Sequence, residues 1–191
     1  MTGLGRLVLE DLRAKSEWNY QRADWKALLH TLATDGTAAM ILYRLMQWAA
    51  ARRLSLLAFV FNKLNAVFNN CIVGRSAHFG PRFVLIHATG VVINSDVRGG
   101  SDVRVEHQVT IGSERHRAPV LGDHVFIGAG AKIIGGVRVG SHVRIGANAV
   151  VVHDVPAHCT VVGVPARIVR RRQPEGHPDI APSEPSAVVL T

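Results

Sequence analysis

The chain places an aliphatic or aromatic residue at every sixth position but one between Val73 and Val151. Helices repeat near 3.6 residues and strands near 2, so neither sustains a period of six. A stack of short strands joined by tight corners does, because each hexad supplies one strand, one inward apolar residue and one turn. The repeated residues are Val73, Phe79, Leu85, Val91, Val97, Val103, Val109, Leu121, Ile127, Ile133, Val139, Ile145 and Val151. The period therefore predicts a β-solenoid.

One position breaks the period. Arg115 stands where an apolar residue is expected between Val109 and Leu121, although these two residues keep the spacing of two hexads. We interpret residues 112–119 as a polar loop that leaves a solenoid whose phase continues on both sides. Loops that leave a regular scaffold carry function more often than the scaffold does. Arg115 and His116 are therefore candidate functional residues.

The composition restricts the partners. A formal net charge of +8 and a pI near 10.5 favour anionic partners. The chain carries no motif of a known nucleic-acid-binding module, so we do not expect nucleic acid among them. Cys71 and Cys159 have no metal-binding spacing and suit a reducing compartment. We expect a cytoplasmic protein, since residues 1–13 show no secretory signal.

Three regions follow from the pattern. Residues 1–70 are predicted to be helical, with helices near 8–17, 24–34 and 37–69, the last broken near 52–55. Asp24 and Thr37 are candidate N-caps, and Gly36 is a candidate helix stop. Residues 71–172 form the predicted solenoid. Residues 173–191 contain four prolines and few large apolar residues, which predicts a disordered tail.

The segment 38–68 is rich in Leu, Phe, Ala and Trp. Charged residues interrupt it well before the roughly 20 apolar residues that a membrane span needs. We therefore expect helices that pack on the solenoid. A helix that lies on a membrane surface is the open alternative, with Arg44, Arg52 and Arg53 near lipid phosphates.

Four short motifs give the chain a resemblance. They read HATG at 87–90, VTIG at 109–112 before the loop with Arg115 and His116, IGAGAKI at 127–133, and GVPAR at 163–167. Over about residues 11–170 the chain resembles the serine acetyltransferase branch of the hexapeptide-repeat acyltransferases. The resemblance implies a left-handed parallel β-helix with three-sided coils, four to five of them here. It also implies a homotrimer whose active sites lie between chains, with a dimer of trimers left open.

The resemblance implies an acetyl-CoA-dependent O-acetyltransferase, acting on serine or a related small hydroxyl acceptor and serving cysteine biosynthesis. His87 matches the general base. Because imidazole titrates near neutrality, one histidine can take the hydroxyl proton and return it to the departing sulfur. His116 matches the second histidine of the family's site. Arg115 matches the residue that holds the acceptor carboxylate, which suits the planar fork of a guanidinium.

The same resemblance implies where acetyl-CoA binds. The matching positions are mostly small residues, which let the cofactor approach the backbone. The hexapeptide repeat also requires glycine and alanine at such positions, so the repeat alone is a second explanation for them. Three basic residues, Lys132, Arg167 and Arg170, are available to the phosphates. The remaining matching positions are Gly112, Gly128, Ala129, Gly130, Ala131, Gly146 and Ala147. No metal is expected.

The chain departs from the family pattern at acidic positions. Ile86 replaces the aspartate that grips the amino group of serine, and Ile72 replaces the one that orients the catalytic imidazole. A third acidic position aligns with Asn19, or with Asp24 if a gap is allowed. An ammonium buried without these partners costs several kcal/mol, so we expect free serine to be a poor acceptor.

Some assignments stay open at this stage. Glu106 and His107, or a backbone carbonyl, are candidates to orient His87, and Glu106 and His107 could instead line an acceptor pocket. One alternative function is a sugar O- or N-acetyltransferase of polysaccharide or natural-product biosynthesis. Another is a noncatalytic assembly module. A third is a zinc hydrolase of the same fold using His87, His107 and His116, although their spacing differs from that branch.

Overall fold

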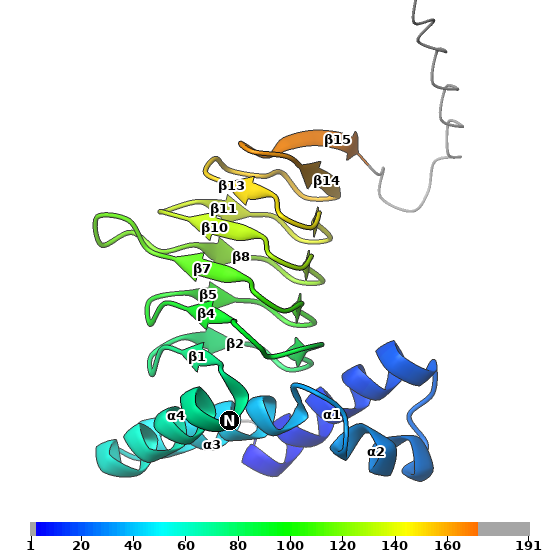
Figure 1. Cartoon of the computed structure of the whole chain (residues 1–191), viewed down its shortest axis with the longest axis vertical. Helices are drawn as coiled ribbons and strands as arrows, with labels where there is room; N and C mark the ends of the chain where they lie inside the picture. The colour runs from blue at the N-terminus through cyan, green and yellow to red at the C-terminus, as the bar shows by residue number, and fades with distance from the viewer. Residues whose placement is uncertain (1–2, 172–191) are drawn as a thin grey trace, which may run out of the picture.

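The computed structural model describes residues 3–171, in which four helices precede a stack of short strands (Figure 1). The helices are α1 (Leu4–Tyr20), α2 (Trp25–Leu32), α3 (Thr37–Ala51) and α4 (Ser55–Asn69). They confirm the predicted helices and the break near 52–55, where Arg53 adopts a left-handed φ of 60°. The predicted tail, residues 173–191, lies outside the described residues.

The two predicted N-caps have different outcomes. The side chain of Asp24 accepts a hydrogen bond from the Ala27 backbone N–H at 2.9 Å, which confirms it as the cap of α2. The prediction for Thr37 is wrong, because its hydroxyl donates to the Thr31 carbonyl oxygen at 2.8 Å. Gly36 takes the N-cap position of α3 with a φ of 76°. Gly36 therefore begins a helix and does not stop one.

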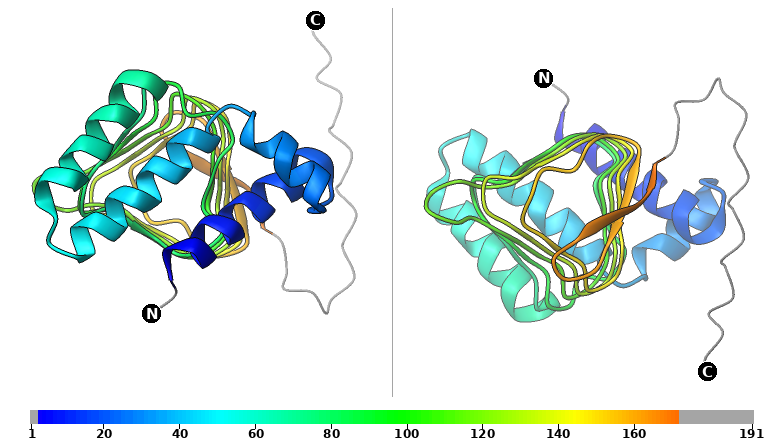
Figure 2. Two further views of the ribbon diagram at one scale, coloured as in Figure 1. Left: turned by 90° about the horizontal axis from the view of Figure 1, so that it is seen from below. Right: turned by 90° about the horizontal axis from the view of Figure 1, so that it is seen from above.

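The strands form three faces of a parallel solenoid, and the coils are three-sided when viewed along the axis (Figure 2). Sheet A contains β1 (Ile72–Val73), β4 (Val92–Ile93), β7 (Thr110–Gly112), β10 (Lys132–Ile134) and β13 (Val150–Val151). Sheet B contains β2 (His78–Phe79), β5 (Arg98–Gly99), β8 (Val120–Leu121) and β11 (Arg138–Val139). Sheet C contains β3 (Val84–Leu85), β6 (Arg104–Val105), β9 (Phe126–Ile127), β12 (Arg144–Ile145), β14 (Cys159–Val162) and the antiparallel β15 (Arg167–Arg171). This arrangement confirms the predicted parallel β-solenoid.

The strand register corrects the predicted phase in the middle of the chain. In sheet A, Val73 pairs with Ile93 and Ile93 with Ile111. The interior positions therefore lie two residues after those predicted from Val91 to Val109. All four of the predicted residues there are fully buried nonetheless: Val91, Val97, Val103 and Val109.

Two insertions explain why this shift of the interior positions is not visible in the sequence period. Eight residues separate the consecutive interior positions Leu85 and Ile93, and ten separate Ile111 and Leu121, whereas a regular side of the coil uses six. The extra residues of the two insertions together equal one hexad, so the period looks unbroken from end to end. The first insertion carries His87, and the second carries the loop with Arg115 and His116.

Aromatic residues fill the end of the solenoid that meets the helices. The rings of Phe79 and Phe83 stack with centroids 4.3 Å apart, and both are fully buried. A side chain at Gly99, the next interior position of sheet B, would collide with the Phe79 ring. Glycine therefore replaces an aliphatic residue at that level because phenylalanine from the coil below occupies its space.

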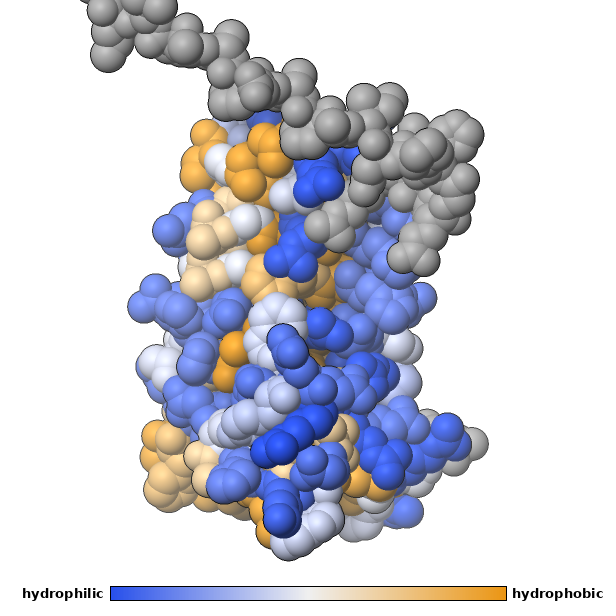
Figure 3. Space-filling view, turned by 90° about the vertical axis from the view of Figure 1, so that its right-hand side faces the viewer, coloured by the Kyte–Doolittle hydropathy of each residue, from blue (hydrophilic) through white to orange (hydrophobic). Residues whose placement is uncertain are grey.

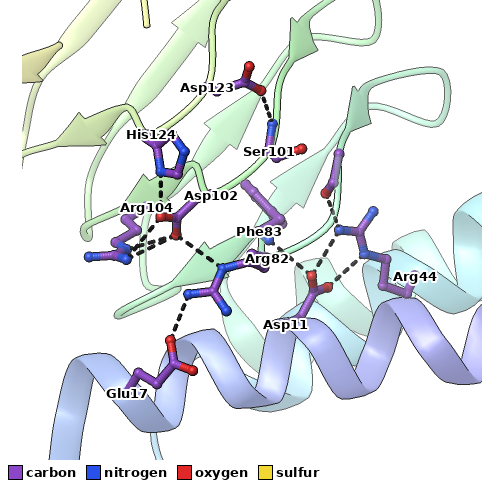
Figure 4. A network of polar contacts seen from close by, with 11 residues as sticks. Asp11, Glu17, Arg44, Arg82, Phe83, Ser101, Asp102, Arg104, Asp123 and His124 are labelled. Carbon is purple, nitrogen blue, oxygen red and sulfur yellow. Dashed lines mark hydrogen bonds and ion pairs between the residues drawn. The ribbon is translucent and has the colours of Figure 1, made fainter. Parts of the chain in front are cut away.

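A buried ion pair joins the helices to the first coil (Figure 4). Arg44 Nε and Nη2 donate to the Asp11 carboxylate at 2.7 and 3.0 Å, and both side chains are at most 2% exposed. Arg44 also donates to the carbonyl oxygens of Phe79 at 2.9 Å and Gly80 at 2.6 Å, and the Phe83 N–H donates to Asp11 at 2.9 Å. These contacts fix α1 and α3 against β2 and β3.

Two further findings bear on the membrane alternative. No helix within residues 3–171 is both long and apolar enough to cross a membrane. Arg44 is fully engaged in the interior, so the prediction that it could reach lipid phosphates is wrong.

Candidate active site

His87 lies at the corner between sheets C and A, immediately after β3, and its side chain is half exposed. His107 occupies the same corner one coil later, with its ring 5.9 Å from that of His87 and nearly perpendicular to it. The coils are joined there by backbone hydrogen bonds, such as Gln108 N–H to Thr89 O at 2.9 Å. The corner therefore holds two imidazoles in a vertical row.

Small residues continue this row. Gly128, Ala129 and Gly130 turn the same corner in the third coil, and Gly146 and Ala147 turn it in the fourth. A side chain at Gly128 would lie 2.7 Å from the Ala147 backbone nitrogen, and Gly130 has a φ of 71°. Coil stacking thus requires glycine here. It also leaves no large side chain at Gly128, Ala129 and Gly130 beside the two histidines, which fits a ligand that lies along the corner.

The other predicted cofactor residues do not all lie in this row. Ala131 is fully buried inside the solenoid. Lys132 Nζ donates to the Gln108 carbonyl oxygen at 2.6 Å, and Gly112 lies at the end of β7, toward a different corner. Arg167 and Arg170 are exposed on β15 at the C-terminal end of the stack. On the face seen in Figure 3, apolar residues gather in the upper half. Val162 at the end of β14 and Val164 just after it are exposed.

The loop with Arg115 and His116 leaves the solenoid between β7 and β8, at the corner between sheets A and B. It protrudes from the left side of the stack in Figure 1, and it is closed by reciprocal backbone hydrogen bonds between Glu114 and Arg117 at 2.9 Å. Both Arg115 and His116 are exposed. One chain therefore keeps these two residues away from His87, at a different corner.

The carboxylate beside His87 comes from the helical region. Asp35 Oδ2 lies 3.3 Å from His87 Nδ1, and Asp35 belongs to the turn between α2 and α3. Glu106, a residue that the sequence suggested for this role, lies 3.6 Å from His107 Nδ1 instead. Sequence analysis missed Asp35 because no periodic pattern connects a helix turn to a solenoid corner 52 residues later.

A buried lysine lies under this contact. Lys15 Nζ donates to the carbonyl oxygens of Leu85 at 2.7 Å, Ile86 at 3.3 Å and Asp35, and the side chain is fully buried. Three acceptors match the three protons of an ammonium group. Burial lowers the pKa of Lys15 to about 8, against an opposing effect of the Asp35 charge.

The acidic positions that the family resemblance led us to expect are apolar or amide side chains. Ile86 is 7% exposed, Ile72 is 48% exposed, and Asn19 is exposed on α1. Asp24, the alternative to Asn19, is engaged as the cap of α2. No group of three or more His, Cys, Asp or Glu side chains in the described part of the chain could hold a metal ion.

Comparisons with known proteins identify the family. A curated serine acetyltransferase of Helicobacter pylori (strain J99) is 34% identical over 172 residues, which cover 88% of this chain and 95% of that relative. The chain belongs to the serine acetyltransferase family. The model of the bacterial transferase hexapeptide (six repeats) matches residues 118–153. The predicted resemblance is therefore confirmed.

Two further members of the serine acetyltransferase family are longer than this chain. The serine acetyltransferase of Mycobacterium tuberculosis is 40% identical over 145 residues, covering 73% of this chain but 62% of that relative. The crystal structure of Neisseria gonorrhoeae serine acetyltransferase superposes with a TM-score of 0.79 at 34% identity, covering 88% of this chain and 66% of that one. This member of the family thus spans about two thirds of their length.

The depressed pKa of Lys15 predicts a pH-dependent contribution to stability. Between about pH 8 and 10.5 the unfolded chain keeps the proton on Lys15 while the folded chain releases it, so stability must rise with pH. From pH 7.5 to 9.5 we expect the free energy of unfolding of the wild type to gain about 2 kcal/mol relative to Lys15→Met. Urea unfolding at both pH values measures the difference, and a constant difference would contradict it.

Proposed function

We propose that the protein is an acetyl-CoA-dependent O-acetyltransferase that transfers acetyl to the hydroxyl of serine or a related small acceptor. The observation that carries the proposal is the row on one corner, in which His87 and His107 precede the small residues of the next two coils, in a member of this family. Among the structurally similar proteins, one serine acetyltransferase is a complex with CoA, and that of Neisseria gonorrhoeae is a complex with serine.

His87 carries the chemistry. Its Nδ1 faces Asp35, so the proton belongs on Nδ1 and Nε2 is free to accept the proton of the acceptor hydroxyl. The oxygen then forms a bond to the acetyl carbonyl carbon while the bond from that carbon to sulfur breaks. The imidazolium returns its proton to the departing thiolate, which yields the O-acetyl product and free CoA. Backbone groups along the Gly128–Gly130 turn lie in the same row and fit the donor.

The loop residues complete the site from a second copy of the chain. Arg115 and His116 lie at a different corner from His87, so they can meet His87 only across a chain boundary. The proposed assembly is a homotrimer, since a threefold arrangement brings each loop to the neighbouring chain and closes the ring. Pairing of two trimers through the helices is compatible with this arrangement.

A second acceptor class is favoured by one observation. The position expected to hold the ammonium of serine carries Ile86, and the third acidic position aligns with Asn19, so neither side chain offers a negative charge. A sugar hydroxyl needs no such charge. Acetylation of a sugar is therefore the second candidate, with the same donor and the same general base.

Replacing His87 tests the reaction. We expect His87→Ala to lower kcat for acetyl-CoA-dependent acylation by about 10²- to 10⁴-fold, because the general base is lost. Release of CoA thiol measures the rate, and equilibrium binding of acetyl-CoA should stay near that of the wild type. His153→Asn, at an exposed position on another corner, serves as the matched control. Full activity in His87→Ala would contradict the proposal.

Mixing two inactive variants tests the shared site. His87→Ala and Arg115→Ala should each be nearly inactive alone. When the chains are co-refolded in equal amounts, about three quarters of the trimers contain both, and each of these has one intact site in three. The thiol-release rate should therefore recover to about a quarter of the wild-type value. An absence of recovery in the mixed trimers would contradict the shared site.

The acceptor is tested with serine and 3-hydroxypropanoate, which is serine without its amino group. A site with a carboxylate on the ammonium loses roughly 2 to 5 kcal/mol when that group is removed, which is about 30-fold or more in kcat/KM. We expect the two acceptors to differ by less than about tenfold here. A preference for serine of 1000-fold, on the order of the upper limit for such pairs, would contradict the inference drawn from Ile86.

A further inference from the structure

The neighbourhood of His87 contains a set of contacts that the proposed reaction alone does not explain. Asp35 reaches the imidazole from the helical region, while the position on the solenoid that the family resemblance assigns to the orienting aspartate is Ile72. Within residues 3–171, Asp35 is the carboxylate within hydrogen-bond distance of His87, whereas Glu106 faces His107. The contact crosses from the helices to the solenoid, so it depends on how the two regions pack.

The turn that carries Asp35 is built to approach the His87 corner closely. Gly36 follows Asp35 with a φ of 76°, in the left-handed region that other residues rarely adopt. A side chain at Gly36 would collide with the Leu85 carbonyl oxygen and would lie 3.1 Å from Lys15 Nζ. Glycine at this position therefore allows the turn to lie directly on the end of β3.

Lys15 binds both partners of the contact. Its ammonium donates to the carbonyl oxygen of Asp35 on the turn, and to those of Leu85 and Ile86 just before His87. A fully buried ammonium is costly unless its protons are all accepted, and here three carbonyl oxygens accept them. One buried side chain thus fixes the separation between the Asp35 backbone and the backbone that presents His87.

The Asp35 to His87 contact itself contributes little to stability. The two side chains are 72% and 50% exposed, and exposed pairs of this kind contribute at most about 1 kcal/mol. The contact does, however, affect the protonation pattern of the imidazole ring. A carboxylate on Nδ1 selects the tautomer with the proton on Nδ1 and leaves Nε2 able to accept a proton.

We propose that Asp35, held in place by Lys15, is the positioning residue that fixes the His87 tautomer for proton transfer. The charge that orients the imidazole is supplied by the turn between α2 and α3, in place of the solenoid position occupied by Ile72. This inference rests on the proposed function for its catalytic meaning, but the pairing itself is a property of the folded chain. The other ionisable groups around the imidazole are Lys15 from α1, and His107 and Glu106 from the next coil.

Asp35→Asn tests the pairing, with Asp96→Asn at an exposed solenoid position as the matched control. In Asp35→Asn we expect kcat to fall about 10- to 100-fold, the KM for acetyl-CoA to change less than about twofold, and the unfolding midpoint in urea to stay unchanged. Asp35→Glu should recover part of kcat.

Nitrogen NMR of ¹⁵N-histidine-labelled protein reads the tautomer without any assay of activity. The His87 signals, assigned with His87→Ala, should report a proton on Nδ1 in the wild type and a mixture of tautomers in Asp35→Asn. Unchanged His87 signals together with a wild-type kcat in Asp35→Asn would overturn the proposal. If the signals change but the wild type releases no thiol with any acceptor, the pairing stands and the proposed function fails.

The role of Lys15 is tested by a double-mutant cycle on kcat. If Lys15 acts by holding Asp35, then Lys15→Met should lower kcat in the wild type. It should have much less effect in the Asp35→Asn background, measured at a temperature where all four proteins are folded. Independent, multiplicative losses would show that Lys15 does not act through Asp35.

Discussion

The structure depends on one constraint, which is that each coil must stack on the next at the spacing of parallel strands, roughly 4.8 Å. This spacing leaves room inside for one apolar residue per strand and outside for corners that follow one another in register. Residues at equivalent corners therefore form vertical rows whatever their separation in sequence. The row formed by His87, His107, Ala129 and Ala147 is a direct consequence, since each lies just after a strand of sheet C. Chemistry that needs an imidazole beside an extended donor is placed along such a row at no cost to the scaffold.

The same constraint restricts where the chain can depart from regularity. A coil tolerates extra residues at its corners because a corner can bulge outward without changing the strands that stack above and below it. Both insertions of this solenoid lie at corners, and they carry His87 and the Arg115 loop. The two insertions supply residues that neither the core nor the stacking of the next coil requires, whereas a regular hexad uses its inward residue for the core and its glycine for the close approach of the next coil.

Sequence reasoning predicted the fold because the period of six is a local consequence of stacking. The break in the same period marked the Arg115 loop, whereas His87 and the small residues of the later coils were indicated by the family resemblance. Sequence reasoning missed the shift of phase between Val91 and Val109, since the two insertions together equal one hexad. It missed Asp35 for a different reason: the contact with His87 joins two regions whose packing is set by the Asp11 to Arg44 ion pair and by Lys15, and a one-dimensional pattern carries no information about such packing. Thr37 was wrongly predicted as a cap because Gly36 must take the left-handed turn there.

The position of Asp35 gives the helical region a second role, which is to supply the carboxylate beside His87. In a solenoid whose orienting carboxylate lies on its own strand, the helices could serve assembly alone, and the corner with the histidine would remain competent without them. Here the solenoid carries Ile72 at that strand, and the carboxylate arrives on a turn that is held by a lysine from α1 and fixed to the first coil by Arg44 and Asp11. The contact between the carboxylate and the imidazole therefore depends on the packing of α1 against the solenoid. Under the proposed function, helix docking and proton transfer are therefore coupled, and the buried charges that the docking requires also hold the site together.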